Sequence, residues 1–314
     1  MSLSLLFGTT GFVMAAYAVI ANDSAQTLGT FISSNKETAW WKKWIVMSSI
    51  LVGTLTYAWL SGDVAHERLN SIPLPITFHW YHALAPLLLL GLTRLGIPVS
   101  TTILTLSVFS SSFVLQKILL KSAVGYGLAA VVAYGLWFLV TKFLNEDDEV
   151  PKSQEKGWRV AQWLATGFLW HQWLAHDIAN VAVYLPRGTN LDLGLFVIFM
   201  TLLVGFLGRL FYTHGGKIQE IVQSKSGTAY VRSATIVDFV YAIILLYFKE
   251  YSDIPMSTTW VFVGLLCGRE LAIYRKFNKG KEITEVFPVL AADFLKMSLG
   301  LALSIVLVFI VSAV

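Results

Sequence analysis

The chain has 314 residues, of which 56% are apolar and 13% are charged, and its formal net charge is +4. A soluble domain is about a quarter charged. This composition, with a mean hydropathy of +0.66, therefore predicts a protein whose solvent is mostly membrane lipid. The single cysteine, Cys267, excludes internal disulfides and a thiolate metal cluster. We expect no nucleic-acid partner.

The apolar residues form ten segments, five on each side of a charged stretch at 145–152. In chain order the segments are 3–21, 44–61, 83–96, 97–115, 122–144, 160–183, 192–211, 233–250, 254–274 and 288–313. A helix that crosses a bilayer needs about 20 mostly apolar residues. The sequence thus predicts an all-α integral membrane protein, with a first transmembrane repeat at 1–144, a charged cytoplasmic linker at 145–158 and a second repeat at 159–314.

Two short polar motifs occur once in each half, in the same order. Residues 22–26 are matched by 176–180 at an offset of 154, and 98–102 are matched by 255–259 at an offset of 157. An odd number of crossings in each half makes the second half enter from the opposite side, so we expect an inverted-topology repeat. Polar interruptions at corresponding positions of such a repeat indicate the binding site of a transporter.

The Pro-x-Ser-Thr-Thr motif interrupts an apolar segment in each half. Segment 83–96 is too short to cross a bilayer before Pro98, and Pro255 breaks the corresponding place. We therefore predict broken or re-entrant hairpins, which are tolerated only inside protein or around a cavity. Proline followed by serine favours a helix start, and a buried helix N-terminus binds anions. The predicted anion-binding residues are Ser100, Thr101, Thr102, Ser257, Thr258 and Thr259, with Asp23 and Asp177 beside them.

A plainer interpretation of the same residues is that the serines only cap helices and the threonines only bond within them. The matched copies favour the anion site. Asp23 and Asp177 follow long apolar runs, and an intramembrane carboxylate is costly and functional by default. The alternative is that both lie at water-exposed helix ends. Oxygen ligands suit sodium or a proton relay, and the residues predicted for that role are Asn22, Asp23, Gln26, His176, Asp177 and Asn180. No other metal and no cofactor are expected.

The lysines and arginines test the orientation. If the N-terminus is outside, most of them fall in inner loops, whereas Lys117 and Lys121 lie in an outer loop between two segments. This bias predicts a multi-pass protein of the cell (inner) membrane with both termini outside.

The two motifs resemble those of the inorganic phosphate transporter family, which is sodium- or proton-coupled and includes a sulfate permease branch. The family's Gly-Ala-Asn-Asp-x-x-Asn-x-x-Gly-Thr run is similar to residues 21–30, and in the second half to 177–180. Its Pro-x-Ser-Thr-Thr run is similar to residues 98–102 and 255–259. The resemblance implies inverted repeats, a phosphate bound between the two Ser-Thr-Thr helix ends, and cations near the Asp and Asn residues.

The sequence departs from this family pattern at several positions. Gln26 replaces the second Asn, His176 replaces Asn or Gln, the Gly that follows the second-half run is lost, and Ile103 and Trp260 replace a His. These changes put the cation, and with it the anion, in question. Because His176 titrates near neutral pH, it is a hint of proton coupling.

The leading hypothesis is a secondary transporter of phosphate, coupled to a sodium or proton gradient, that works by alternating access. The alternatives are a sulfate permease of the same fold, an anion channel without cation coupling, and a sensor that does not transport. An enzyme is disfavoured because no nucleophile and base stand at useful spacing. Asp238 and His82 occupy corresponding places, and either line the pathway or pair with neighbours. The oligomeric state is open, with a homodimer as one arrangement.

Overall fold

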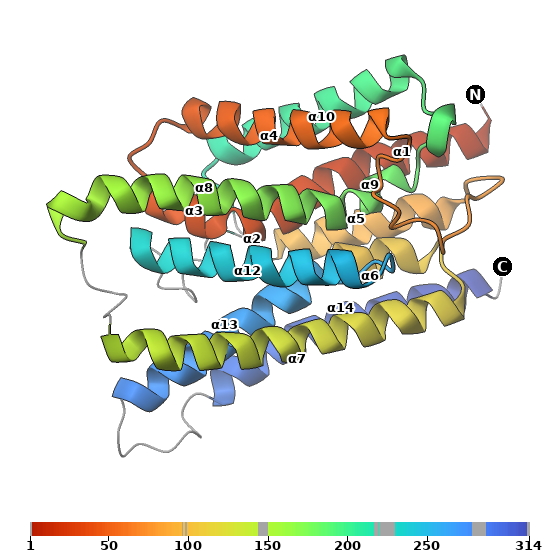
Figure 1. Cartoon of the computed structure of the whole chain (residues 1–314). Coiled ribbons are helices and arrows are strands. Elements are labelled where there is room, and N and C mark those ends of the chain that lie inside the picture. Colours follow the sequence, from red (N-terminus) through yellow and green to blue (C-terminus); the bar gives the residue numbers. More distant parts are fainter. Residues whose placement is uncertain are drawn as a thin grey trace.

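The computed structural model describes residues 2–95, 97, 99–143, 150–216, 219, 230–277 and 287–312. Every regular element in these ranges is a helix, and the long helices run roughly along one axis (Figure 1). Pro98, Leu144 and residues 145–149 of the predicted linker lie outside the described residues, whereas residues 152–158 of that linker are helical. The division into two repeats and a linker stays a prediction.

The helices of the first half are α1 Leu3–Ala18, η1 Val19–Ser24, α2 Ala25–Thr27, α3 Gly29–Ser34, α4 Trp40–Leu60, α5 Trp80–Arg94, α6 Thr101–Ser107 and α7 Ser112–Phe143. The helices of the second half are α8 Lys152–Asp177, α9 Ala179–Ala182, η2 Gly188–Asn190, α10 Leu193–Tyr212, α12 Val231–Tyr251, α13 Thr258–Phe277 and α14 Phe287–Ser312. Breaks between these helices fall at both copies of both polar motifs.

Five helical stretches of the described residues are long and apolar enough to cross a membrane. They are Leu3–Thr27, Trp40–Leu60, Ser112–Val140, Leu193–Tyr212 and Val231–Tyr251. The chain is therefore a multi-pass membrane protein, and the prediction of an all-α membrane fold is confirmed.

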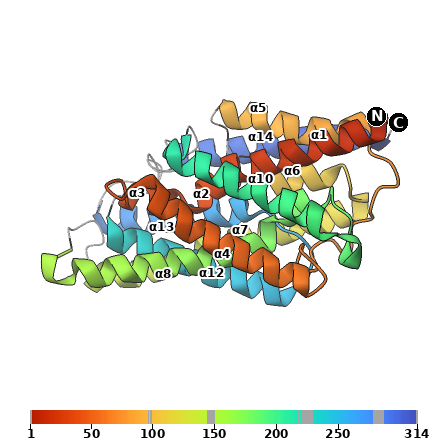
Figure 2. The same ribbon diagram turned by 90° about the horizontal axis from the view of Figure 1, so that it is seen from above.

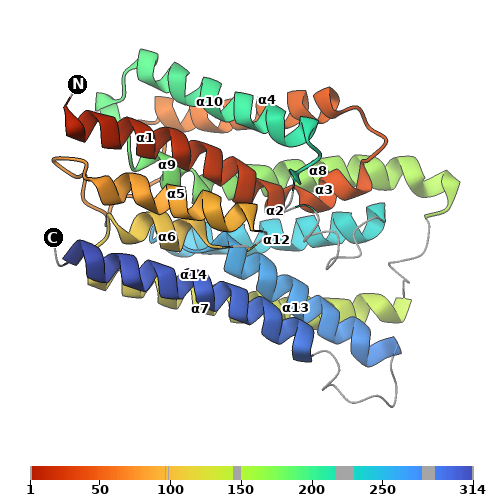
Figure 3. The ribbon, with the colours of Figure 1, turned by 180° about the vertical axis from the view of Figure 1, so that it is seen from behind.

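Both chain termini lie at one end of the bundle, which we call the terminal end (Figure 2). The opposite end, where α7 finishes and α8 begins, is the linker end. Helix α5 runs inward from the terminal end and α6 turns back towards it, whereas α12 starts at the linker end and α13 returns there (Figures 1 and 3). The two Pro-x-Ser-Thr-Thr segments therefore belong to hairpins that open at opposite ends.

The two halves pack against each other through their helices. Helix α7 packs along α13, α6 along α14 and α4 along α10, while α1 with α5 and α8 with α12 pair within their own halves. At the α7–α13 contact the two backbones approach closely, since a Cβ added at Gly264 or Gly268 would lie 2.3 or 2.0 Å from a backbone oxygen of α7. Small residues four apart allow this approach between membrane helices.

One boundary differs from the sequence-based expectation. Segments 97–115 and 122–144 were expected to be separate, with Lys117 and Lys121 in a loop between them, yet both lysines lie within α7. Lys117 is exposed and lies over the Phe113 ring. Lys121 is buried, and its ammonium donates to the Ser252 and Ile254 carbonyls at 2.7 and 2.6 Å. These long-range partners compensate for the charge, so the helix continues.

Candidate functional site

Both Asn-Asp motifs lie where a helix is interrupted. Asn22 and Asp23 are in η1, a π-helical turn between α1 and α2. In the second half, α8 ends at Asp177, and the four-residue α9 follows after Ile178. π-Turns are frequent at functional sites because they free backbone groups and redirect side chains. The local structure therefore aims both carboxylates into the bundle.

The Asp23 carboxyl is held by a chain of amides. Asn22 Nδ2 donates to Asp23 Oδ1 at 2.5 Å and to the Val99 carbonyl at 2.8 Å. Gln26 Nε2 donates in turn to Asn22 Oδ1 at 3.3 Å. The Val99 contact ties η1 directly to the first Pro-x-Ser-Thr-Thr segment. The hydroxyl groups that lie beside the Asp23 carboxyl are those of Thr101 and Thr259.

The Asp177 carboxyl has a corresponding set of neighbours. Thr102 Oγ1 donates to Asp177 Oδ1 at 3.3 Å, and Asn180 Nδ2 donates to the same oxygen at 3.2 Å. Asn180 Nδ2 also lies 3.1 Å from Thr102 Oγ1. The Thr258 side chain lies beside the carboxyl as well. The three residues Thr102, Asp177 and Asn180 thus close a small triangle of polar contacts.

These two clusters form one site that joins the halves. Asp23, from the first half, has Thr259 of the second half beside it, and Asp177 receives a hydrogen bond from Thr102 of the first half. The two carboxyls are near enough to interact electrostatically. The predicted residues that gather here are all 5% exposed or less: Asn22, Asp23, Gln26, Ser100, Thr101, Thr102, Asp177, Asn180, Ser257, Thr258 and Thr259.

The two serines of the motifs cap helices. Ser100 Oγ accepts from Ile103 N and Ser257 Oγ accepts from Trp260 N, each at 3.1 Å. Each serine keeps its own hydroxyl hydrogen for another acceptor. Helix α6 has seven residues, whereas α13 has twenty. If an anion binds here, the helix-terminus contribution to its binding is therefore uneven, and the first half offers mainly its threonine hydroxyls.

Three oxygens of the site have no hydrogen-bond partner among the described residues: Asp23 Oδ2, Asp177 Oδ2 and Asn180 Oδ1. No lysine or arginine in the described part of the chain forms a salt bridge to either carboxylate. Buried carboxylates without a counter-charge are costly. A group of buried oxygens around two carboxylates fits a hard cation such as sodium, or protons.

His176 faces away from this site. Its Nε2 lies 2.8 Å from the Leu245 carbonyl of α12, and no described hydrogen bond joins it to either carboxylate. Asp238 forms a separate buried contact, in which Thr30 of α3 and Thr166 of α8 donate to its two oxygens, the second at 2.5 Å. His82, its counterpart in sequence, accepts from His79 N at 2.9 Å near the terminal end. None of these three residues forms a described hydrogen bond to the Asp23 or Asp177 carboxyl.

The structure adds residues to the site that the sequence did not indicate. Tyr241 of α12 donates its hydroxyl to the Thr258 carbonyl at 2.9 Å and lies near both carboxylates. Ser122 Oγ of α7 accepts from Ser257 N at 2.8 Å. The chain has 12 tyrosines, and no pattern distinguishes Tyr241 from the others. Ser122 was predicted to begin the apolar segment 122–144, and no pattern marked it as a site residue.

A basic pair at the terminal end supports the second motif. Arg68 is 1% exposed and donates to the carbonyls of Ala175 and Ser252, the first at 3.4 Å. It therefore bridges the end of α8 and the connection that precedes Ser257, where Lys121 also binds. A polar cavity of about 430 Å³ reaches Arg68 from this end, lined also by Asp63, His66 and Lys249.

Comparison with known proteins bears on the fold. No family model matches the chain, and no curated protein matches it. Among solved structures, a chain described as "The sodium-dependent phosphate transporter" is similar over 100% of both chains, with a TM-score of 0.65 and 16% sequence identity. At this identity the likeness shows the fold. It is the fold that the resemblance of the two motifs predicted.

Proposed function

We propose that the protein is a secondary active transporter of an inorganic oxyanion, phosphate first, coupled to a sodium ion or a proton and working by alternating access. Two independent findings support this function. The chain shares the fold of a protein described as a sodium-dependent phosphate transporter. Residues from both copies of its two polar motifs, one copy in each half of the sequence, converge on one buried site.

The observation that carries the proposal is that hydroxyl donors and carboxylates share one site. Thr102 gives its single hydroxyl hydrogen to Asp177. An oxyanion bound at the Ser-Thr-Thr segments would need the same hydrogen. Asp177 and the anion therefore compete for Thr102, and Asp23 stands in the same relation to the Thr101 and Thr259 hydroxyls beside it.

A coupling cation resolves this competition. A sodium ion or a proton on Asp23 and Asp177 satisfies the unpartnered Oδ2 atoms and weakens the demand of the carboxylates for hydroxyl donors. The threonines are then free to donate to the anion, whose charge the cation also offsets. Binding of the two solutes is mutually favourable, and linkage requires the effect to be equal in both directions.

The test is uptake of labelled phosphate into proteoliposomes that hold the purified chain. Uptake is measured with an inward sodium gradient, with a proton gradient and with neither, and with unlabelled sulfate as competitor. We expect uphill uptake under one gradient, which identifies the coupling cation. Asp177→Asn should abolish the dependence on that gradient, whereas Asp192→Asn, an exposed helix cap of α10, should leave it unchanged.

Three results would contradict the proposal in different ways. Phosphate flux that follows its own gradient and ignores both cations would indicate an anion channel. Transport of sulfate without transport of phosphate would indicate a sulfate permease of the same fold. Saturable phosphate binding without any flux would indicate a sensor.

A further inference from the structure

Two buried cations of the first half hold one short segment of the second half. Arg68, in the connection after α4, and Lys121 of α7 both donate to the Ser252 carbonyl, the lysine at 2.7 Å. Lys121 also donates to the Ile254 carbonyl at 2.6 Å. Arg68 donates in addition to the Ala175 carbonyl of α8 at 3.4 Å. A buried charge is costly unless such partners compensate for it, so both cations depend on carbonyls of the other half.

The carbonyls that accept these hydrogen bonds lie beside the second copies of both polar motifs. Ala175 lies two residues before Asp177, and segment 252–254 leads directly into the motif at 255–259. Arg68 is also near enough to Asp177 to interact with it electrostatically. A movement of segment 252–254 away from the first half would therefore move the start of α13, with its serine and threonine hydroxyls.

The terminal-end cavity of about 430 Å³ ends at this contact. Its lining comes from both halves, with α4 and the connection after it on one side, and the end of α12 with Asp253 on the other. At about 30 Å³ per water in the liquid, it has room for a hydrated ion. Arg68 lines the cavity and also contacts the end of α8, so it stands between the cavity and the second Asn-Asp motif.

Arg68 has alternative partners on the cavity side. The carboxyls of Glu67, Glu250 and Asp253 line the cavity and are near enough to interact with the guanidinium electrostatically. No salt bridge within the described part of the chain joins any of them to Arg68. A guanidinium that leaves the two carbonyls can therefore bind carboxylates, which form stronger hydrogen bonds with a cation. Two discrete arrangements of one element are the basis of a switch.

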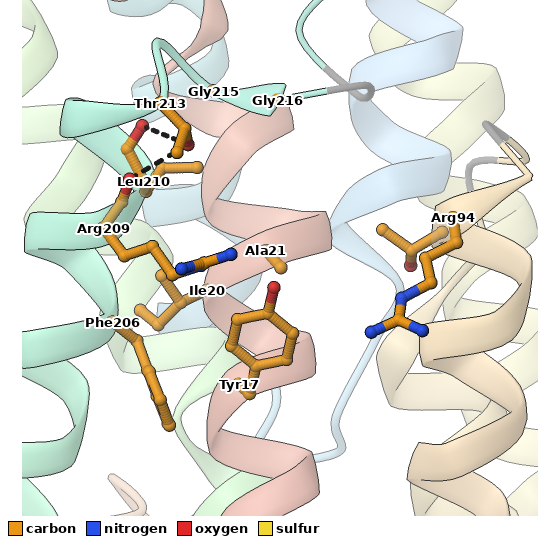
Figure 4. Close-up of a pocket in the computed structure, with 11 residues that line it drawn as sticks. Tyr17, Ile20, Ala21, Arg94, Phe206, Arg209, Leu210, Thr213, Gly215 and Gly216 are labelled. Atoms are coloured by element: carbon orange, nitrogen blue, oxygen red, sulfur yellow. Dashed lines mark hydrogen bonds between the residues drawn. The ribbon is translucent and has the colours of Figure 1, made fainter.

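The cavity between α1, α5 and α10 differs from the terminal-end cavity. It has a volume of about 240 Å³ and reaches Ile20 and Ala21, next to the first Asn-Asp motif (Figure 4). Its lining is mostly apolar, and its two arginines, Arg94 and Arg209, are exposed. Of these two cavities, the terminal-end cavity alone meets a buried cation that crosses to the other half.

We propose that Arg68 and Lys121 form a gate that closes the transport pathway at the terminal end, and that the 430 Å³ cavity is the mouth of the pathway on that side. In the closed state both cations hold segment 252–254 against the first half. Opening releases these carbonyls, and Arg68 moves to the carboxylates of the cavity. The gate rests on the transport function proposed above, but its test measures neither phosphate binding nor flux.

The experiment measures how fast a thiol behind the gate is modified. Ser257→Cys places a thiol at a fully buried position next to the held segment, and the native Cys267, also buried, reports on loosening of the whole fold. The purified full chain in detergent, without sodium or phosphate, is treated with a charged methanethiosulfonate reagent, and peptide mass spectrometry follows each cysteine. Arg68→Gln and Lys121→Gln are each compared with Lys249→Gln, which removes a cation from the same cavity that pairs within its own half.

The expected result is that each gate variant speeds modification of the introduced thiol by roughly tenfold or more, as the loss of a hydrogen bond from a charged donor predicts. Cys267 should stay protected, and Lys249→Gln should have no effect. Each gate variant tests the gate by itself, so the test stands if one of them does not purify.

Three results would overturn the gate. One is an unchanged rate at the introduced thiol in the gate variants. Another is equal acceleration at both cysteines, because the two cations would then only stabilise the fold. The third is equal acceleration in Lys249→Gln, because loss of charge and not of the contact would then be the cause. Opening of the gate in a chain that shows no phosphate uptake in proteoliposomes would refute the transport function and leave the switch itself in place.

Discussion

Replacing Thr102 by valine removes one hydroxyl from the buried site at almost constant volume. In the structure this hydroxyl donates to Asp177 Oδ1 at 3.3 Å and accepts from Asn180 Nδ2 at 3.1 Å. Thr105, one turn further along α6, offers a matched control. It is also fully buried, and its hydroxyl has no hydrogen-bond partner among the described residues.

The expected loss of phosphate affinity follows from the charge of the anion to which Thr102 would donate. A hydrogen bond to a charged group contributes about 1.5–3 kcal/mol net, and about 1.4 kcal/mol corresponds to a factor of ten in affinity. If Thr102 donates to the bound anion, Thr102→Val should raise the apparent phosphate constant at least roughly tenfold. Thr105→Val removes only an unsatisfied hydroxyl, so it should leave the constant unchanged and the stability equal or slightly higher.

The assay is initial-rate uptake of labelled phosphate in proteoliposomes, over a range of phosphate concentrations at saturating cation. Thermal unfolding of each purified variant in detergent checks that the fold is kept. Equal effects of the two substitutions would refute the reasoning, since both would then act through α6 packing. A normal phosphate constant in Thr102→Val would show that this hydroxyl does not touch the anion.

Three further predictions, one of them with a control substitution, test other parts of the structure. Asp177→Asn keeps the shape of the side chain but removes its charge, so phosphate should still bind while its affinity no longer changes with cation concentration, as binding titrations would show. Gly268→Ala places a Cβ 2.0 Å from a backbone oxygen of α7 and should lower the free energy of unfolding by about 1–3 kcal/mol. Gly135→Ala, with nothing within 4 Å, should be neutral or up to about 1 kcal/mol stabilising, and similar melting of the two variants would contradict the close α7–α13 contact. Burial, reinforced by Lys249, lowers the pKa of His66 to about 4, below its ordinary value of about 6.5. The folded protein therefore loses stability as the pH falls through 6.5 towards 4, by roughly 1–2 kcal/mol between pH 8 and pH 5. His66→Gln should remove that part of the pH dependence of stability in thermal melts. If the melting temperature of the variant changes with pH as much as that of the unmodified protein, His66 does not cause this pH dependence.

The recurrence of the two motifs made the centre of the molecule predictable. A polar motif that interrupts apolar segments twice, at matched spacing, marks positions where helices break. Helices begin at Thr101 and Thr258, within the two Pro-x-Ser-Thr-Thr segments where interruptions were predicted, whereas the interruptions at Asp23 and Asp177 were not predicted. The site forms only if the motif copies of the two halves lie next to each other. Their proximity depends on the α7–α13 and α6–α14 contacts between the halves.

Contacts between residues far apart in the sequence, which satisfy buried polar and charged groups, were not predictable from the sequence. Lys121 is charged, and a charged residue between two apolar segments predicts a loop. It lies inside a helix because backbone carbonyls more than 130 positions away in the sequence accept hydrogen bonds from its ammonium group. Tyr241 joins the site through a single backbone carbonyl. The glycines at 264 and 268 did carry a local signal, small residues four apart on an apolar helix, which indicates a close helix contact but not its partner.

In the proposed transport function, the contacts between the halves would link cation binding to the motion of one half against the other. Asp177 is bound by Thr102 of the opposite half, and Asp23 lies beside Thr259 of the opposite half. Rocking one half against the other, as alternating access requires, must lengthen at least one of these contacts and leave a buried carboxylate with fewer donors. That loss opposes opening whenever the carboxylates are charged and alone. A cation on the carboxylates removes this penalty, and an anion without a cation does not. If the protein is the coupled transporter proposed above, the two aspartates that would bind the coupling cation would also prevent it from opening with the anion alone, which is the condition for tight coupling.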